Sequence, residues 1–308
     1  MPQGSVLGPL LFLLFVNDIG IDINYSSIST FADDTKIAKK VNNHDDKNYF
    51  QKDINSLCEW AENWGMELNI SKTKVMHLGR NNIKHEYKIS DTIIDRTVEQ
   101  KDLGIIIHDS LKWGPHILNS VKSANKILGL ISRTLEYKSA DTVIPLYKSL
   151  VRPILEYASQ FWSPFLIKDI ECLERVQRRA TKLIPGIRNM SYENRLKFLN
   201  LTTLESRRTR CDLIQLYKIL HGYDKIQTDD IFEIIYSSTR SNGSKIGLKP
   251  GRRYNTDLFK NFYFNRVIGS WNSLPEFVVE SSSLSKFKSN FDKFILNGGT
   301  VNKFYSLH

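Results

Sequence analysis

The sequence predicts an α+β fold, with short strands in its first third and helices after them. β-prone runs flank a pair of turn residues between 28 and 38, and further strands are expected at 68–76 and 101–107. From about residue 113 onward, apolar residues recur every three or four positions, which is the period of an amphipathic helix. A length of 308 residues suggests about two domains.

Composition excludes several classes of protein. With 41% hydrophobic and 25% charged residues, the chain is an ordinary globular protein that can bury a core. Its three cysteines, Cys58, Cys172 and Cys211, have neither disulfide nor zinc spacing, which fits a reducing compartment. The apolar run at 10–16 is short of the roughly 20 residues that span a bilayer, and no basic segment precedes it. We therefore expect an intracellular protein, nuclear or cytoplasmic, without a signal peptide or membrane partner.

The first element that carries chemistry is an expected hairpin with Asp33 and Asp34 at its tip. Apolar or β-prone residues lie on both sides of this pair, as in two strands joined by a two-residue turn. Neighbouring carboxylates repel each other, and each raises the free energy of ionising the other. Such a pair favours a bound cation, and hard oxygen ligands favour Mg²⁺. An ordinary solvated turn is the alternative, because Asp is common in turns.

Upstream of the hairpin, a glycine-containing turn at residues 2–5 leads into an apolar helix. Gly8-Pro9 is a favourable helix start, since proline is tolerated at the first helical position. We expect the apolar run at 10–16 to be buried as a core helix. The alternative is an ordinary capped helix without a functional role.

Downstream of the hairpin, a helix and two strands are expected. Apolar residues at spacings of four and three predict an amphipathic helix that packs on a sheet, through Phe50, Ile54, Leu57, Ala61 and Trp64. A loop and a strand follow at 68–76, and one more strand at 101–107. Lys72 lies in that loop, where a solvated lysine is the plain alternative to a functional one.

The order and spacing of these motifs resemble the reverse transcriptases of jockey-like non-LTR retrotransposons. The resemblance covers nearly the whole chain, and the two motifs Pro2-Gln3-Gly4 and Phe31-Ala32-Asp33-Asp34 are highly specific. It implies a partial polymerase palm, built from an antiparallel sheet with helices, followed by a mostly α-helical thumb and carboxy-terminal region. The implied activity is RNA-directed DNA synthesis by two-metal nucleotidyl transfer.

The resemblance also implies roles for individual residues. Asp33 would be a direct Mg²⁺ ligand with Asp34 as its supporting neighbour, and Lys72 would act near the leaving pyrophosphate. The implied partners are an RNA template, a DNA primer or target, and deoxynucleotides. Template and primer contacts are implied for Gln3, Gly4, Ser5 and Phe31.

The family supplies a further metal-binding Asp from a strand upstream of the Pro-Gln-Gly turn. The sequence starts at Met1 within that turn, so we expect the fragment to have an incomplete metal site and to lack the fingers. Positioning and metal charge provide most of the catalysis in phosphoryl transfer. The isolated chain is therefore expected to be inactive in primer extension, which leaves its status as an enzyme open.

The net charge of +10 is unevenly distributed. Acidic and basic residues balance through residue 170, so the whole surplus lies in 171–308. A localised basic patch is the electrostatic footprint of a protein that binds a phosphate backbone. Two helical stretches, about 170–183 and 201–220, carry arginines that the resemblance assigns to a thumb gripping the template–primer duplex, namely Arg175, Arg178, Arg179, Arg207 and Arg208. For any single arginine, a solvated or ion-paired surface residue is the alternative.

Three segments are expected: a partial palm at 1–112, a helical thumb or basic extension at 113–236, and a linker with a carboxy-terminal module at 237–308. Aromatic residues in the last segment are expected mainly in a core, although stacking on single-stranded bases is an alternative. The rival to the polymerase function is a non-catalytic nucleic-acid-binding remnant of a mobile element.

Overall fold

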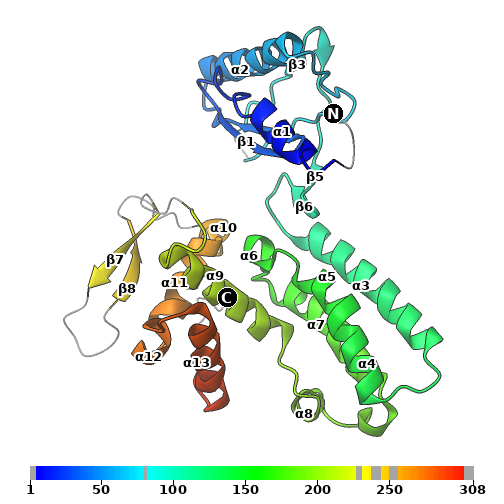
Figure 1. Cartoon of the computed structure of the whole chain (residues 1–308). Helices are drawn as coiled ribbons and strands as arrows, with labels where there is room; N and C mark the ends of the chain where they lie inside the picture. Colours follow the sequence, from blue (N-terminus) through cyan, green and yellow to red (C-terminus); the bar gives the residue numbers. More distant parts are fainter. Residues whose placement is uncertain (1–4, 80–81, 227–230, 237–243, 250–255, 302–308) are drawn as a thin grey trace. The chain divides into compact units, whose positions relative to one another are not determined.

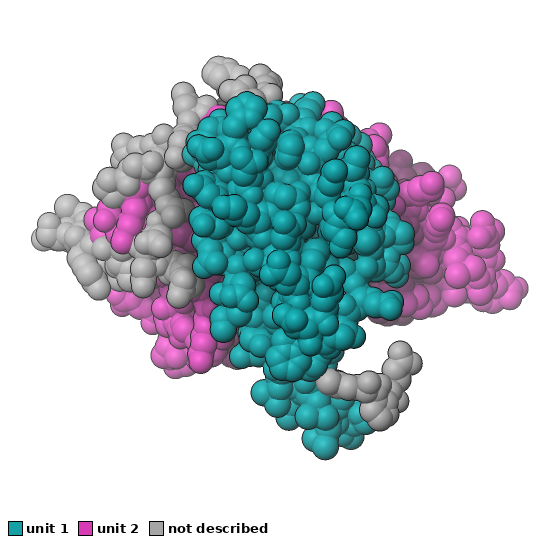
Figure 2. Space-filling model, turned by 90° about the horizontal axis from the view of Figure 1, so that it is seen from above, with its two compact units in different colours: residues 1–112 teal, residues 113–308 magenta. Residues whose placement is uncertain are grey.

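The computed structural model describes residues 5–79, 82–226, 231–236, 244–249 and 256–301, and it divides into two compact units. Unit 1 comprises residues 1–112 and unit 2 residues 113–308 (Figure 2). Helices and short antiparallel strands are both present, so the α+β class is confirmed. Within the described ranges, unit 1 carries three small sheets, and unit 2 is mostly helical with one small sheet (Figure 1).

In unit 1, each sheet of the described residues is a single two-stranded hairpin. The pairs are β1 (Ser27–Phe31) with β2 (Asp34–Ala38), β3 (Lys88–Ile89) with β4 (Thr92–Ile93), and β5 (Glu99–Asp102) with β6 (Ile105–His108). The prediction of a single strand at 101–107 is therefore wrong, because the chain reverses at Leu103-Gly104 and forms two strands. Both turn residues have positive φ, which is the backbone of a tight hairpin turn. The strand expected at 68–76 is also absent, and Val75 forms only an isolated bridge to Arg96.

Helix α2 (His44–Asn63) is the long helix of unit 1. Asn43 and Asp46 form a reciprocal capping box at its start, which satisfies two backbone donors that no helical carbonyl can reach. Ile54 and Ala61 are buried as expected, while Trp64 is 48% exposed and Trp60 takes the interior position. The Trp60 indole donates to Asp18 Oδ1 at 3.0 Å, which connects this helix to the segment after α1.

Helix α1 (Gly8–Phe15) forms where the sequence predicts it, but its burial was predicted wrongly. None of its residues is buried, and Leu10 and Leu14 are 55% and 67% exposed. One edge of the helix contacts the rest of unit 1, because Phe12 and Phe15 pack against the cluster of Trp60 and Ala61. Val16, which follows the helix and ends the predicted run, is buried in that cluster. The apolar run is enough to form a helix, whereas burial requires a partner surface that the described residues do not supply.

The helices of unit 2 start with α3 (Gly114–Thr134) and α4 (Ala140–Leu146), which continues into the π-helical turn η1 (Tyr147–Val151) and α5 (Arg152–Glu156). Helices α6 (Ser159–Trp162) and α7 (Ile167–Lys182), the 3-10 turn η2 (Pro185–Ile187), α8 (Tyr192–Phe198) and α9 (Leu204–Leu220) follow. The hairpin of β7 (Phe232–Tyr236) and β8 (Ser244–Leu248) precedes α10 (Asp257–Lys260), α11 (Tyr263–Asn272), α12 (Glu276–Val279) and α13 (Leu284–Leu296).

One large core joins α9 to the carboxy-terminal helices. Leu213 and Leu216 of α9 pack with Trp271 of α11 and Phe287 of α13, all at most 2% exposed. This core takes described residues from both sides of the boundary predicted at 236/237, and residues 237–243 of the expected linker lie outside the described residues. Most described aromatics of this segment are core residues, because Tyr263, Phe264 and Trp271 are buried.

Candidate functional site

The β1–β2 hairpin places its two aspartates differently along the turn. Phe31 pairs with Asp34 across the strands, so Ala32 and Asp33 form the two-residue loop. Ala32 has a φ of +50°, as tight hairpin turns require. Asp33 therefore lies at the tip, and Asp34 is the first residue of β2 rather than a second tip residue.

Both carboxylates are open to solvent. Asp33 and Asp34 are exposed, as is the ring of Phe31, and neither aspartate has a hydrogen-bond or ion-pair partner in the described part of the chain. Across those same residues, no group of three or more Asp, Glu, His or Cys side chains is arranged to hold a metal ion. The hairpin thus offers two unneutralised carboxylates, but the described chain does not close a cage around a cation.

A buried aspartate anchors the start of this hairpin. Asp53, only 1% exposed on α2, accepts backbone N–H groups of Asn24 at 3.1 Å and Tyr25 at 3.1 Å. A buried carboxylate needs such donors, because it would otherwise lose its hydration without compensation. Asp53 was not singled out from the sequence, where a polar residue beside the apolar stripe of a helix was the only available signal.

Lys36 supports the hairpin from its other strand. Its ammonium forms a 2.5 Å ion pair with Asp102 Oδ2, which links β2 to β5 within unit 1. Lys36 therefore has a carboxylate partner of its own and forms no ion pair with Asp33 or Asp34.

Lys72 is exposed in a turn that Asn69 organises. The Asn69 side chain accepts hydrogen bonds from the Ser71 hydroxyl at 2.8 Å and the Lys72 backbone N–H at 3.1 Å. The ammonium of Lys72 has no ion-pair partner among the described residues, and no hydrogen bond within the described chain joins it to Asp33 or Asp34. Lys74, two residues on, is instead paired with Asp95 at 2.7 Å, which lowers the pKa of Asp95.

The expected template turn lies partly outside the described residues. Gln3 and Gly4 are not described, and Ser5 accepts the backbone N–H of Gly8 at 3.0 Å through its hydroxyl. Ser5 lies two residues before the N-cap residue Leu7, and its hydroxyl satisfies one backbone N–H at the first turn of α1.

Helix α7 has a buried apolar face and an exposed basic face. Its interior face is closed over Leu173, Val176 and Ala180, each at most 1% exposed. The opposite face is a basic stripe of exposed side chains at positions three and four apart, Arg175, Arg178, Arg179 and Lys182. Arg178 lies over the Tyr192 ring, and Arg179 donates to Asn125 on α3 at 3.1 Å. The stripe brings three of the five expected arginines onto one surface.

The other two expected arginines, on α9, are placed differently. Arg207 forms a bidentate pair with Glu156, which includes an Nη2–Oε2 hydrogen bond of 3.0 Å and raises the pKa of its guanidinium. Arg208, its neighbour, is 2% exposed and lies in the interior. Consecutive helical residues point about 100° apart, so one can line the surface while the next is buried.

Two buried polar residues of α7 organise the segment that precedes α9. Glu174 Oε2 accepts the backbone N–H of Leu204 at 3.0 Å, and the Gln177 amide donates to the carbonyl of Thr202 at 3.0 Å. Tyr147 from η1 donates its hydroxyl to Gln177 at 2.8 Å, and burial strongly raises the pKa of that phenol. Sequence reasoning noticed this run for its arginines and missed the buried pair between them.

Comparisons with known proteins find similarity to polymerases of mobile elements. Residues 1–130 match the family described as reverse transcriptase (RNA-dependent DNA polymerase). The chain is 27% identical over 212 residues to the probable RNA-directed DNA polymerase from transposon X-element of Drosophila melanogaster, which covers 64% of this chain and 23% of that protein. It is 25% identical over 198 residues to the RNA-directed DNA polymerase from mobile element jockey of the same species, covering 60% of this chain and 22% of that protein.

The resemblance to jockey-like non-LTR reverse transcriptases is thus confirmed at the level of the family. The chain spans less than a quarter of the length of these relatives. No solved structure matches the chain. Among the described helices, none is long and apolar enough to cross a membrane.

Proposed function

We propose that this chain is part of an RNA-directed DNA polymerase of a non-LTR retrotransposon and carries its aspartate hairpin. The observation that supports this most is the exposed Asp33–Asp34 pair on β1–β2, within the residues that match the reverse transcriptase family. The palm would lie in unit 1, and the helices of unit 2 would supply a thumb. The substrates would be an RNA template, a DNA primer or target, and deoxynucleotides, inside the cell.

The carboxylate oxygens of the hairpin are the type of ligand that Mg²⁺ prefers, but two carboxylates are too few for a two-metal site. Mg²⁺ binds proteins through one or two carboxylates plus phosphate oxygens of the substrate, which matches two solvent-open aspartates. When bound, a pair of such ions supplies electrostatic stabilisation of the charge that develops on the transferred phosphate. Asp33 would hold the metal directly and Asp34 would support it. A two-metal site would need a further carboxylate besides Asp33 and Asp34, and the described residues place none beside them.

The remaining predicted residues would position nucleic acid around this hairpin. Phe31 would pack near the primer end, and Gln3, Gly4 and Ser5 would lie beneath the templating base pair. Lys72 would offset charge on, or donate a proton to, the leaving pyrophosphate, since its ammonium is exposed and without an ion pair in the described chain.

The basic stripe of α7 would grip the phosphate backbone of the template–primer duplex. Arg175, Arg178 and Arg179 are exposed on one helical face, as contacts to a regular backbone require. Arg207 would contribute from a second surface. Arg208 was also predicted to bind template or primer, but its burial favours a structural place in α9.

Metal binding at the hairpin tests the proposal directly. In ¹⁵N NMR spectra of the full 308-residue chain, Mn²⁺ should broaden the amide signals of Asp33 and Asp34 first, because its unpaired electrons relax nearby nuclei. Asp33→Asn should remove this broadening, while Asp22→Asn, an exposed aspartate outside the hairpin, should leave it unchanged. Equal broadening in Asp33→Asn and wild type would contradict a metal role for Asp33.

Primer extension on an RNA template tests the activity of the chain by itself. We expect no extension by the 308-residue polypeptide in Mg²⁺ and deoxynucleotides, because the described residues supply too few ligands for two metals. Robust extension that Asp33→Asn abolishes would contradict the predicted inactivity and support the polymerase role.

The second candidate is a non-catalytic nucleic-acid-binding remnant of a mobile element. It is favoured by the contrast between an exposed basic stripe on α7 and the absence, among described residues, of a closed metal cage. The two candidates differ in one measurement. Duplex binding without Mn²⁺ binding at Asp33 would favour the remnant.

A further inference from the structure

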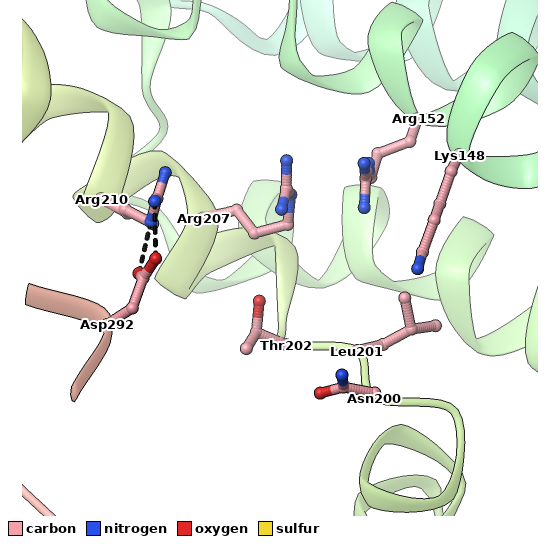
Figure 3. A pocket seen from close by; sticks show the side chains of 8 residues that line it. All are labelled: Lys148, Arg152, Asn200, Leu201, Thr202, Arg207, Arg210 and Asp292. Carbon is pink, nitrogen blue, oxygen red and sulfur yellow. Dashed lines mark hydrogen bonds and ion pairs between the residues drawn. The ribbon is translucent and has the colours of Figure 1, made fainter. Parts of the chain in front are cut away.

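A pocket of about 390 Å³ in unit 2 is lined by more cations than anions (Figure 3). It lies where η1, α5, α9 and α13 meet the segment before α9, and its lining residues are Lys148, Arg152, Asn200, Leu201, Thr202, Arg207, Arg210 and Asp292. Figure 3 shows Arg207, Arg152 and Lys148 in a row facing that segment, with Arg210 and Asp292 at one end. We propose that this pocket binds a phosphate group of a nucleic-acid strand.

Two carboxylates hold the guanidinium groups of the pocket in place. Glu156 binds Arg207 bidentately and lies 3.8 Å from Arg152 Nε, and Asp292 binds Arg210 through bonds of 2.7 and 2.8 Å. The three arginines and Lys148 carry four positive charges, and Glu156 and Asp292 carry two negative charges. The formal net charge of this group is therefore +2. Each bidentate pair uses Nε and Nη2, so the Nη1 donors of Arg207 and Arg210 remain for a ligand.

Lys148 is the cation most available to a ligand. It is exposed on η1 and has no ion-pair partner in the described part of the chain. The π-helical turn that carries it is anchored by Tyr147 and Val151, which are both fully buried. π-Helical turns are rare and occur often at functional sites. The backbone beneath Lys148 is therefore fixed, although its side chain is solvated.

The segment at 200–202 forms the opposite wall of the pocket and supplies uncharged hydrogen-bonding side chains. Asn200 has a φ of +48°, and neither its side-chain amide nor the Thr202 hydroxyl has a hydrogen-bond partner among the described residues. Gln177 and Glu174 of α7 hold this segment through Thr202 and Leu204. Arginine, lysine, asparagine and threonine are all side chains that contact phosphate oxygens in nucleic-acid complexes.

The combination favours phosphate over a carboxylate ligand. A carboxylate is satisfied by one guanidinium fork, whereas the pocket presents spare donors from two arginines, an ammonium, an amide and a hydroxyl. A phosphate group has oxygens enough for all of them. The nucleic-acid source of that phosphate rests on the proposed function.

Charge reversal at Lys148 tests the proposal. Binding of a labelled RNA–DNA duplex by the full chain would be measured by fluorescence anisotropy at several salt concentrations. Lys148→Glu should weaken binding by about tenfold and reduce the slope of log K against log salt by about one or more. Lys225→Glu, an equal charge change on an exposed residue outside the pocket lining, should leave the dissociation constant within about twofold. Lys148→Arg should retain binding.

Acetylation of Lys148 separates the pocket from the proposed function. Mass spectrometry would follow the acetylation rates of Lys148 and Lys225 with inorganic phosphate or with duplex present. Protection of Lys148 alone by both ligands is the expected result. Protection by inorganic phosphate without any duplex binding would overturn the nucleic-acid source while retaining the anion pocket. Normal duplex binding with no protection of Lys148 by either ligand would overturn the pocket and leave the proposed function intact.

Discussion

Gln177 on α7 donates its side-chain amide to the backbone carbonyl of Thr202 at 3.0 Å, across 25 residues of sequence. Gln177 is fully buried and also accepts the Tyr147 hydroxyl. One side chain therefore ties together α7, the π-helical turn and the segment that lines the phosphate pocket. Its exposed neighbour Arg178 belongs to the basic stripe on the other face of the same helix.

Replacing Gln177 should destabilise unit 2. Gln177→Leu removes the hydrogen-bond partner of the buried Tyr147 hydroxyl and of the part-buried Thr202 carbonyl, and an unsatisfied buried group costs about 1–3 kcal/mol. We expect a loss of about 2–4 kcal/mol in the free energy of unfolding of unit 2. Hydrogen exchange of the α9 amides measures it. Arg175→Leu, an exposed position on the same helix, serves as the control, and equal exchange in both variants would contradict the assignment.

Removing the Asp53 carboxylate should loosen the entry to the aspartate hairpin. Asp53→Ala leaves the backbone donors of Asn24 and Tyr25 without their acceptor, which should cost about 2 kcal/mol locally. The Tyr25 amide should then exchange faster with solvent, as peptides covering residues 20–38 would show by mass spectrometry. Asp22→Ala, exposed just before the same segment, should leave exchange unchanged. Unaltered protection in Asp53→Ala would show that the hairpin does not depend on this anchor.

Neutralising the α7 stripe should weaken nucleic-acid binding in a salt-dependent way. Each phosphate contact contributes about 0.7–0.9 to the slope of log K against log salt, so Arg175→Gln with Arg178→Gln should lower it by about 1.5. Anisotropy titrations with a duplex between 50 and 200 mM salt measure the slope. Lys286→Gln with Lys293→Gln, two exposed residues of α13, removes equal charge elsewhere. If that pair has the same effect, binding follows net charge rather than the stripe.

Unit 2 should lose stability as pH falls through about 6.5, because of His116. The ring is 4% exposed against Trp162, and burial lowers its pKa below the usual 6.5. As pH falls, the unfolded chain therefore takes up a proton before the folded chain does, so acid favours unfolding. The loss is at most about 1.4 kcal/mol per pH unit for one proton.

Amide exchange in α3, corrected for the intrinsic effect of pH, should show this slope between pH 7.5 and 5.5. His116→Phe should flatten it, whereas His44→Gln, exposed in unit 1, should preserve it. A slope that His116→Phe leaves intact would assign the pH dependence to other groups.

The exposed face of α1 should tolerate truncation. Leu14 is 67% exposed while its neighbour Phe15 packs edge-on against Trp60 and Trp64, so Leu14→Ala should cost under about 0.5 kcal/mol. Phe15→Ala should cost several times more, since it removes aromatic contacts. Exchange of the α2 amides compares the two variants. Equal destabilisation would mean that Leu14 is buried, as its sequence alone suggests.

Local patterns in the sequence predicted the elements that depend on neighbouring residues. The hairpin around Asp33 follows from β-prone runs on both sides of a short turn, and α7 follows from the period of its apolar stripe. The motifs around Pro2-Gln3-Gly4 and Asp33-Asp34 also indicated the reverse transcriptase family, which the comparisons confirm. These inferences need only information within about ten residues or a shared motif.

Tertiary packing decided what the local pattern leaves open. The apolar run of α1 predicts a helix, but its burial depends on whether another element covers it. Arg207 and Arg208 are adjacent and chemically identical, yet one is ion-paired beside a pocket and the other is buried, because burial follows the orientation of α9. The phosphate pocket joins Lys148 to Arg207 and Asp292, residues far apart in sequence, and only the folded backbone brings those charges close enough to act on one ligand.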